Sequence, residues 1–298
     1  MHRIDEIFEK IRSEKAKTIV IAGAADIEVL SAISKAYERW KANAILVGDK
    51  DAIKAEAAKH GIDVSPFEIF HEGDAAKLPR TAVKLVSEGK GDVLMKGLMQ
   101  TADFFRAVLD PSMGMRVEGQ TICSSGVIEV PGWDRLLILS DVGLIPAPDL
   151  ETKIKLIKNT VPVAKKLGAA IPKVGMLCAA ENINPKVPSM VEADIIAKMN
   201  ERGEIKDCIV AGPISFDLAI SEESAKHKGY SHPVAGKADI LIMPNLETGN
   251  ALAKSINYFA KYKSGGVVSG AAKPMIITSR SDLEEMKLNS IAMALYLS

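Results

Sequence analysis

Three apolar runs in the last fifth of the chain each end in small, polar or glycine residues of a kind that could hold an anion. They lie at residues 241–250, 264–270 and 273–282. Runs of this kind predict strands of an open α/β sheet, and ligands bind at the carboxyl ends of such strands. The first and last runs lead into helical patterns, and a helix start offers unpaired N–H groups and a positive dipole end. The pattern therefore predicts a phosphate-handling site.

Arg280, preceded by Ser279, stands at the end of the last run. Arginine carries a permanent charge on a planar fork that can hold two phosphate oxygens at once, so we expect this pair to belong to the site. In the polar end of the first run, Asn245, Glu247 and Asn250 are candidates for ligand contacts. The same residue types also form turns and cap helices, so both interpretations stay open for these three.

The segment 96–106 has the same context earlier in the chain. Lys96 ends a strand pattern, and Thr101 is expected to cap the helix that follows. Arg106 lies five residues further on, and its side chain could lean back toward the helix start. Asp141 ends another strand pattern, where a ligand could bind. We expect all four side chains to contact an anionic substrate, although a solvent-exposed arginine is the plainer interpretation of Arg106.

Strand and helix patterns alternate through most of the chain and would position these residues. Such alternation implies crossovers between parallel strands, and therefore an α/β fold with mostly parallel sheets. The middle departs from this rhythm, because two apolar runs flank a Pro-Gly turn at 131–134 and predict an antiparallel pair. Strands are predicted at 18–22, 44–47, 67–70, 92–95, 120–130, 135–139, 174–177 and 207–211, and helices at 26–41, 74–88, 149–167, 188–200 and 282–296.

The length of 298 residues is too great for one small core and favours two domains. The antiparallel pair is expected to open the second domain, and the chain is expected to return to the first domain after about Gly270. The predicted boundaries give a discontinuous first domain, 1–118 plus 271–298, and a second domain, 119–270.

The charge balance argues against several classes of partner. Lys+Arg and Asp+Glu both count 38, and aromatic residues make up 5%, so we expect neither nucleic acid nor a membrane as a partner. No uncharged apolar stretch reaches the ~20 residues that span a bilayer, and the charged N-terminus does not resemble a signal peptide. The three cysteines lie far apart beside apolar runs, which is typical of free thiols in a reducing compartment. We therefore expect a cytoplasmic protein.

Familiar cofactor motifs are missing. The first predicted strand ends in Gly23-Ala-Ala-Asp26, which lacks the glycines that a dinucleotide pyrophosphate needs, and neither a Walker-A sequence nor H-E-x-x-H occurs. His227 and His232 lie in a polar loop and are expected to be solvated rather than bound to a metal. We therefore expect neither a metal nor a nicotinamide cofactor.

Six short motifs occur in a fixed order along the chain. They are LMKGL at 94–98 with Thr101 and Arg106, LSDVGL at 139–144, NINPK at 182–186, GPISFD at 212–217, PNLETGN at 244–250 and TSR at 278–280. With these motifs the chain resembles the phosphate acetyl/butyryl transferase family over nearly its whole length, and within that family the members that transfer butyryl groups.

The resemblance implies an isocitrate/isopropylmalate dehydrogenase-like fold, in which two α/β domains hold the active site in the cleft between them. It implies reversible acyl transfer, in which acyl-CoA and inorganic phosphate give acyl phosphate and free CoA. Coenzyme A is then a substrate, no cofactor is bound permanently and no metal is required. It also implies a homodimer or a higher homo-oligomer.

The resemblance also assigns residues. The serine and arginine at the end of the last strand belong to the active site of the acetyl-transferring relatives and match Ser279 and Arg280, and their phosphate-binding arginine matches Arg106. Their acidic residue, proposed as the base for the CoA thiol, falls at Met286 in this chain. Glu284 or Glu285 would take this role if the helix began slightly differently, and we take Glu285 as the candidate. Another arginine of those relatives falls at Tyr258.

We expect CoA thiolate to attack the acyl phosphate directly in a ternary complex, because no nucleophile–base pair in the sequence supports an acyl-enzyme. Within the family, phosphate acetyltransferase activity is the alternative, since acetyl and butyryl differ by only two methylenes. Two readings from other classes are a metal-dependent decarboxylating dehydrogenase, against which the missing acidic cluster argues, and a non-catalytic protein that binds CoA or phosphate.

Overall fold

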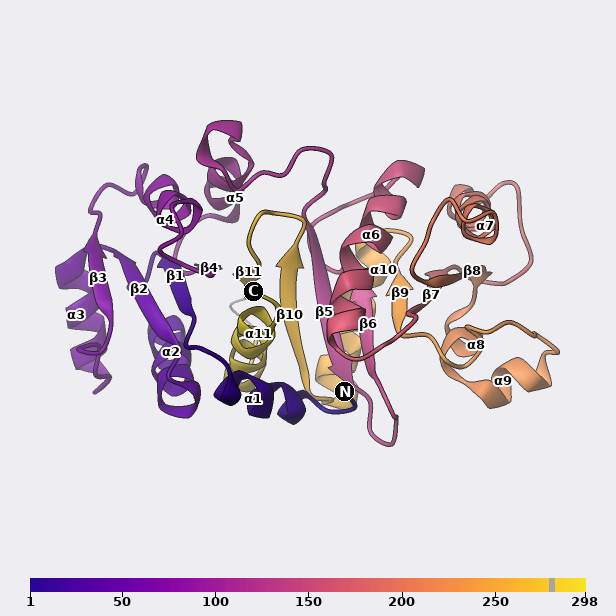
Figure 1. Ribbon diagram of the computed structural model, residues 1–298, viewed down its shortest axis with the longest axis horizontal. Coiled ribbons are helices and arrows are strands. Elements are labelled where there is room, and N and C mark those ends of the chain that lie inside the picture. The colour runs from indigo at the N-terminus through magenta and orange to yellow at the C-terminus, as the bar shows by residue number, and fades with distance from the viewer. Residues whose placement is uncertain (279–281) are drawn as a thin grey trace. The chain divides into compact units, whose positions relative to one another are not determined.

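The computed structural model describes residues 1–278 and 282–298 (Figure 1). The chain divides into two compact units. The central unit comprises Met1–Ile4 and Cys123–Ser264, and the terminal unit comprises Asp5–Ile122 and Gly265–Ser298. The domain boundaries predicted after residue 118 and before residue 271 stay a prediction.

The terminal unit is built on a mostly parallel sheet with strand order β3-β2-β1-β4-β11-β10. All of these neighbours run parallel except β10 and β11, which are antiparallel. In this unit α2 packs against α11, and α4 packs against α5. The strands are β1 (Thr18–Ala22), β2 (Asn43–Gly48), β3 (Glu68–His71), β4 (Val93–Lys96), β10 (Ser264–Ser269) and β11 (Met275–Ile277). The helices are α1 (Ile4–Ser13), α2 (Ile27–Trp40), α3 (Lys50–Lys59), α4 (Leu78–Ser87), α5 (Thr101–Leu109), the 3-10 turn η1 (Pro111–Met113) and α11 (Glu284–Leu297).

Local sequence explains where several of these elements begin and end. The carboxylate of Asp26 accepts from the backbone N–H groups of Glu28 and Val29, each at 3.0 Å, and so caps α2 as predicted. The helix predicted from 74 begins only at Leu78, because Pro79 lies in its first turn, where its fixed φ suits a helix start. The helix α1 was not predicted, although Ile4 and Ile7 are fully buried and repeat at helical spacing.

The central unit contains a sheet with strand order β5-β6-β9-β7-β8. Only β5 and β6 are antiparallel, which confirms the predicted antiparallel pair, and β6, β9, β7 and β8 are parallel to their neighbours. The strands are β5 (Cys123–Glu129), β6 (Leu136–Ser140), β7 (Lys173–Leu177), β8 (Ile209–Ile214) and β9 (Ile240–Ile242). The helices are α6 (Leu150–Lys166), α7 (Pro188–Glu201), α8 (Phe216–Ile220), α9 (Glu222–His227), α10 (Leu246–Ser255) and the π turn η2 (Ile256–Ala260).

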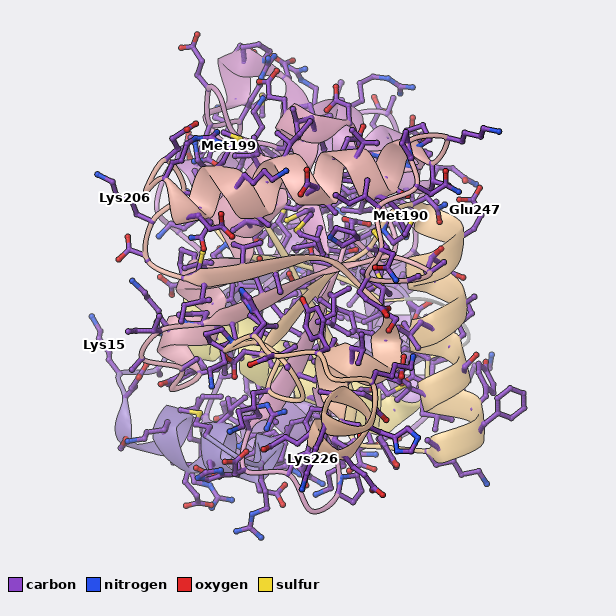
Figure 2. All side chains as sticks on the ribbon, turned by 90° about the vertical axis from the view of Figure 1, so that its right-hand side faces the viewer. Lys15, Met190, Met199, Lys206, Lys226 and Glu247 are labelled. Carbon is purple, nitrogen blue, oxygen red and sulfur yellow. The ribbon has the colours of Figure 1, made fainter. Side chains whose placement is uncertain are left out.

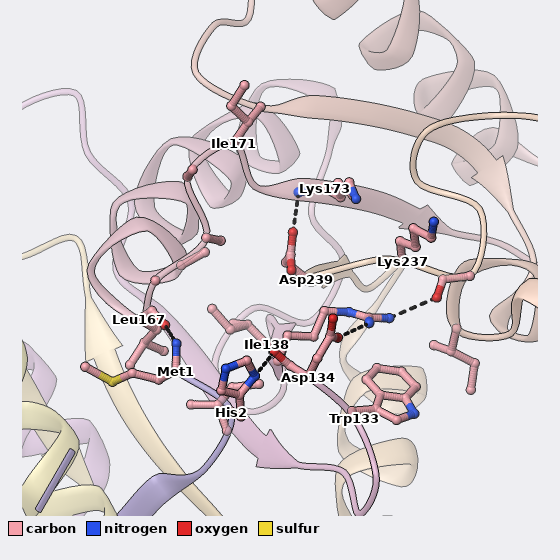
Figure 3. Close-up of a pocket in the computed structure, with 18 of the residues that line it drawn as sticks. Met1, His2, Trp133, Asp134, Ile138, Leu167, Ile171, Lys173, Lys237 and Asp239 are labelled. Carbon is pink, nitrogen blue, oxygen red and sulfur yellow. Dashed lines mark hydrogen bonds and ion pairs between the residues drawn. The ribbon is translucent and has the colours of Figure 1, made fainter. Parts of the chain in front are cut away.

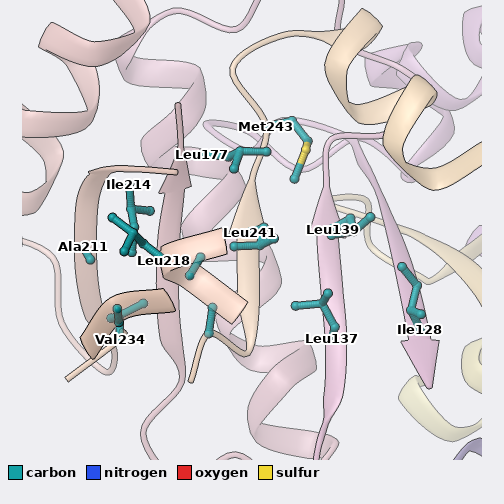
Figure 4. Close-up of a cluster of buried hydrophobic side chains, with 13 residues drawn as sticks. Ile128, Leu137, Leu139, Leu177, Ala211, Ile214, Leu218, Val234, Leu241 and Met243 are labelled. Atoms are coloured by element: carbon teal, nitrogen blue, oxygen red, sulfur yellow. The ribbon is translucent and has the colours of Figure 1, made fainter. Parts of the chain in front are cut away.

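Alternation along the strands places one apolar core on one face of this sheet (Figure 4). Leu137 and Leu139 of β6 and Leu241 of β9 point into a cluster that Leu218 of α8 joins from the helix layer. Each such buried side chain contributes about 1.5–3 kcal/mol through the hydrophobic effect. The strand predicted at 207–211 begins only at Ile209, because Asp207 has a φ of 68°, which a strand does not accommodate.

The parallel strands give the sheet of the central unit two distinct edges. We call the edge where β6, β7, β8 and β9 end the carboxyl edge, and the edge where they begin the amino edge. The sheets confirm the α/β fold with mostly parallel strands that the alternating pattern predicted. Ligands of open α/β sheets bind at carboxyl edges, so the predicted site residues are expected there.

Candidate active site

Asp141 organises the carboxyl edge of the central unit. It follows β6 and is 2% exposed. Its Oδ1 accepts from the backbone N–H of Gly143 at 2.7 Å and of Leu144 at 2.6 Å, and more weakly from that of Ile145 at 3.3 Å. Its Oδ2 accepts from the backbone N–H of Ser124 in β5 at 2.6 Å. Charge-assisted bonds of this kind are strong, so the carboxylate fixes the loop 141–145 against β5.

The first turns of α10 lie directly on this loop. Asn245 is the N-cap residue, and its side chain accepts from the Thr248 N–H at 2.9 Å. Asn250 Nδ2 donates to the carbonyl of Val142 at 3.4 Å. A Cβ atom at Gly249 would lie 2.3 Å from the Asp141 carbonyl oxygen, so only glycine permits this approach. The PNLETGN motif therefore joins the end of β9 to the loop after β6.

The structure thus brings three predicted ligand contacts of the central unit together and leaves the fourth outside. Asp141 and Asn250 both contact the loop 141–145, Asn245 caps the helix that lies on it, and each makes a hydrogen bond within the protein. Glu247 is exposed on α10 and projects from the surface (Figure 2). Of the alternatives that the sequence left open, the capping role is therefore observed for Asn245.

Lys96 ends β4 in the terminal unit, and the chain after it passes close to the end of β1. The next residue, Gly97, donates its backbone N–H to the Ala22 carbonyl at 2.8 Å. A Cβ atom there would lie 2.2 Å from the carbonyl oxygen of Gly23, so the glycine of the LMKGL motif is required by contact with the end of β1. The half-buried Lys96 directs its Nζ to the Gly97 carbonyl at 3.3 Å.

The helix α5 follows this strand end. Its N-cap is Gln100, whose side chain makes no capping bond, and Thr101 is the first helical residue, so the predicted cap was wrong by one position. Arg106 leans back as expected and pairs with Asp103 in the first turn of the helix. The arginine side chain is 75% exposed. Exposed pairs of this kind contribute little, so a phosphate could replace Asp103 as the partner of the guanidinium.

The acidic candidates lie at the start of α11, which begins at Glu284 with Leu283 as its N-cap residue. Glu284 pairs with Lys35 of α2, whereas Glu285 is exposed. Ser279 and Arg280 lie outside the described residues, so their predicted place in the site stays a prediction. Tyr258, to which the resemblance assigns the position of an arginine, is 58% exposed in η2.

Sequence reasoning missed a buried ion pair at the carboxyl edge of the central unit. Lys153 Nζ in the first turn of α6 pairs with Glu192 of α7, and their side chains are 4% and 24% exposed. The pair lies near Cys178 at the end of β7, whose pKa is raised to about 11 by burial, against the opposing effect of the Lys153 charge. A usable signal existed, because Lys153 falls on the buried stripe of α6 with Leu156.

Burial raises the pKa of Cys208 to about 11 as well, so neither thiol is expected to ionise near neutral pH. Within residues 1–278 and 282–298, no cluster of three or more histidine, cysteine, aspartate or glutamate side chains has the arrangement of a metal site. In the same part of the chain, no helix has the length and apolar character needed to cross a membrane.

Comparison with known proteins identifies the fold and then the family. A branched-chain phosphotransacylase from Enterococcus faecalis V583 has a crystal structure that matches with a TM-score of 0.84 and 33% identity, over 94% of this chain and 98% of that chain. This α/β fold is therefore that of a solved phosphotransacylase.

Sequence comparison gives the same result. The family described as phosphate acetyl/butaryl transferase matches residues 3–81 and 77–295. Phosphate butyryltransferase of Clostridium acetobutylicum is 47% identical over 290 residues, 97% of this chain and 96% of that protein. Phosphate acetyltransferase of Thermotoga maritima is 39% identical over 291 residues, 98% of both. The chain belongs to the phosphate acetyl/butyryl transferase family, as its motifs predicted.

Proposed function

We propose that the protein is an acyltransferase that moves a short-chain acyl group, preferably butyryl, between coenzyme A and inorganic phosphate. The observation that carries this proposal is the similarity to a phosphate butyryltransferase over nearly the full length of both chains. The six motifs lie within the aligned length. In the described part of the chain, LMKGL, LSDVGL and GPISFD span the ends of β4, β6 and β8, where α/β sheets bind ligands.

The phosphoryl group of the substrate would be held by Arg106 and Lys96 near the start of α5. The Arg106 guanidinium is mostly exposed, and its carboxylate partner Asp103 is a weak competitor for a dianionic phosphate. Thr101 and the free N–H groups of the first turn of α5 would add hydrogen-bond donors, because the N-cap residue Gln100 makes no capping bond.

Ser279 and Arg280 would act at the reacting carbonyl, as the family resemblance implies. CoA thiolate attacks the carbonyl carbon of the acyl phosphate, the new C–S bond forms, and the C–O bond to the leaving phosphate breaks. Negative charge develops on the carbonyl oxygen, where a fixed donor is typically worth about 10²–10³ in rate. The proton of the thiol passes to a carboxylate, for which we propose Glu285, and such a base contributes about 10²–10⁴.

Asp141, Asn245 and Asn250 would act mainly by positioning. All the hydrogen bonds of the Asp141 carboxylate described above run to backbone N–H groups, and the aspartate is almost fully buried. We propose that it holds the loop 141–145 in shape, so that backbone groups of this loop and side chains of α10, Glu247 among them, contact the substrate.

The resemblance supports further proposals about the assembly. These are an isocitrate/isopropylmalate dehydrogenase-like arrangement with the active site between two domains, a homodimer or higher homo-oligomer, and a cytoplasmic location. CoA would be a substrate, with no permanently bound cofactor. Phosphate acetyltransferase activity is the second candidate function, favoured by the Thermotoga maritima relative.

The test measures CoA release from butyryl-CoA and acetyl-CoA in parallel, with and without phosphate and without added metal, using a thiol reagent. Faster phosphate-dependent release from butyryl-CoA is the expected result, and a preference for acetyl-CoA would favour the second candidate. Release from neither substrate would contradict the proposal. Direct transfer is tested by mass spectrometry of the protein after incubation with butyryl-CoA alone, where a trapped acylated residue would exclude the ternary-complex mechanism.

A further inference from the structure

A cavity of about 950 Å³ opens at the amino edge of the central unit (Figure 3). It lies at the opposite end of the strands from Asp141, so the proposed acyl transfer makes no use of it. The starts of β6, β9 and β7 line it, together with the end of α6 and the chain around Gly236. A volume of this size is sufficient for a small molecule.

Arg135 forms one wall of the cavity, and each of its three side-chain nitrogens already donates a hydrogen bond within the protein. Its Nε donates to the carbonyl of Ala238 at 3.2 Å, and its Nη2 donates to that of Gly236 at 2.9 Å. Its Nη1 pairs with Asp134 at 3.0 Å, and its guanidinium stacks on the Trp133 ring at 4.3 Å. These contacts engage three of the five N–H donors and hold the guanidinium in place.

Asp239 and Lys173, by contrast, each keep a charged atom available. Asp239 Oδ2 accepts from the backbone N–H of Lys173 at 2.8 Å. Within the described part of the chain, Asp239 Oδ1 has no hydrogen-bond partner and Lys173 Nζ has no ion-pair partner. Both side chains are half-buried, and they border one space in Figure 3. The backbones are directly paired, since the Asp239 N–H donates to the Lys173 carbonyl at 2.8 Å.

An opposite pair of charges that line one cavity without joining favours a ligand that carries both charges itself. A simple anion at Lys173 would be repelled by Asp239, and a simple cation at Asp239 would be repelled by Lys173. Burial raises the pKa of Asp239, against the effects of the Lys173 N–H and the nearby charges of Arg135 and Lys173, so the carboxylate gains from a partner. The other walls include the apolar side chain of Ile220, which is only partly buried.

We propose that this cavity binds an α-amino acid with an aliphatic side chain. The carboxylate of the ligand pairs with Lys173 Nζ, its ammonium group pairs with Asp239 Oδ1, and its side chain packs on Ile220. The site is distinct from the acyl-transfer site and does not rest on the proposed function.

The binding test compares three probes of one shape by isothermal titration calorimetry. Leucine carries both charges, 4-methylpentanoate lacks the ammonium group and 3-methylbutylamine lacks the carboxylate. Leucine is expected to bind at least about tenfold more tightly than either analogue, because each analogue leaves one charge of the site unpaired. Quenching of the fluorescence of Trp133 gives a second readout, and a Trp40→Phe background removes the other tryptophan, which is buried in the terminal unit.

Substitutions test the two contacts separately. Asp239→Asn keeps an oxygen for the Lys173 N–H, and Lys173→Met keeps the length of the side chain, so both should fold. Each is expected to weaken leucine binding by about tenfold or more. The matched controls are Asp134→Asn and Lys237→Met, whose side chains are exposed and paired with Arg135 and Glu222. They should change leucine affinity by less than about twofold.

Three results would overturn the proposal. They are no leucine binding by the unaltered protein, equal binding of leucine and 4-methylpentanoate, and unchanged affinity in Asp239→Asn. None of these results depends on turnover, so a failure here leaves the proposed acyl transfer untouched. Conversely, all three measurements can be made on a protein that shows no acyl transfer.

Discussion

The two edges of the sheet in the central unit each carry an aspartate beside a strand, and they use its carboxylate differently. At the carboxyl edge, Asp141 is buried and accepts from four backbone N–H groups. At the amino edge, Asp239 is half-buried, and its described hydrogen bond runs from the Lys173 N–H to one of its oxygens. The same type of side chain therefore stabilises a loop at one edge and keeps an oxygen available to a cavity at the other.

This difference separates positioning from binding in physical terms. A carboxylate whose oxygens are all engaged has nothing left to offer a ligand, and its removal leaves several buried donors without acceptors. A carboxylate with a free oxygen in a cavity can bind a ligand, and its loss costs the fold little. The residue type and the place beside a strand are the same in the two cases, whereas burial and the count of hydrogen bonds differ, and the hydrogen bonds decide the role.

The largest expected effect is on turnover, because we place the chemistry at strand carboxyl ends. Arg280→Ala should lower turnover by about 10²–10³, as expected when a donor to a developing oxyanion is lost. Arg12→Ala, an exposed arginine paired with Glu9, is the matched control and should leave turnover unchanged. The measurement is phosphate-dependent CoA release at saturating butyryl-CoA. Near-normal turnover in Arg280→Ala would remove this arginine from the site.

The next effect compares the two aspartates directly. Asp141→Asn should lower the free energy of unfolding by about 2–4 kcal/mol, because the new amide group faces backbone donors. Asp239→Asn should lower it by less than about 1 kcal/mol, because the asparagine oxygen still accepts from Lys173. Urea unfolding of both variants, followed by circular dichroism, gives the two values. Equal losses would mean that the hydrogen-bond count does not separate the roles.

Gly249→Ala tests how tightly α10 lies on the Asp141 loop. Alanine favours an ordinary helix position over glycine by about 1 kcal/mol, so a loose contact would make this variant more stable. The Asp141 carbonyl oxygen would instead lie 2.3 Å from the new Cβ atom, and we expect a loss of about 1–3 kcal/mol. Lys254→Ala, at an exposed position of the same helix, is the control in the same unfolding assay.

A smaller effect concerns phosphate binding at α5. Arg106→Ala should raise the KM for phosphate by about tenfold with a lesser change in kcat, because an exposed charge pair contributes ground-state binding. Asp103→Asn removes the competing carboxylate and should change the same KM in the opposite direction. A fall in kcat at unchanged KM in Arg106→Ala would instead mean that this arginine stabilises the transition state.

The elements that position the site could largely be predicted from the sequence, because their signals are local. The strand predicted at 18–22 is β1, and Asp26 and Asn245 cap helices because each carries a short acceptor side chain just before a helical run. Errors occurred where two local signals competed. Thr101 is a good capping residue, yet the helix begins there and Gln100 occupies the cap position.

The roles of individual polar side chains could not be predicted, because they depend on distant residues. Asp141 meets the N–H of Ser124, which lies in a strand 17 residues away, and Lys153 meets Glu192, 39 residues away. The cavity at the amino edge exists only because three strands begin side by side. The sequence pattern therefore located the residues at strand ends. Their hydrogen-bond partners decide whether each residue binds a ligand or stabilises a loop.

The smallest expected effect concerns pH and follows from the raised pKa of Asp239, whose main cause is burial. Below the ordinary aspartate pKa of 3.8 the group is protonated in both the folded and the unfolded protein, and its burial carries no charge penalty. As the pH rises above the ordinary pKa, the unfolded protein loses this proton while the folded protein still keeps it. The stability that protonation gives to the folded protein is therefore lost as the pH rises through the raised pKa.

Asp239→Asn cannot ionise, so this loss should disappear in the variant. The difference in unfolding free energy between the unaltered protein and Asp239→Asn should therefore shift in favour of the variant as the pH rises from about 4 to 7. Leucine should restore the unfolding free energy that the unaltered protein loses as the pH rises, because its ammonium group stabilises the Asp239 carboxylate. Asp141 offers the contrast, since the backbone N–H groups that meet its charged form are part of the fold and no ligand is needed to complete them. Urea unfolding across this range, with and without leucine, measures both effects, and a pH-independent difference would show that Asp239 is already paired.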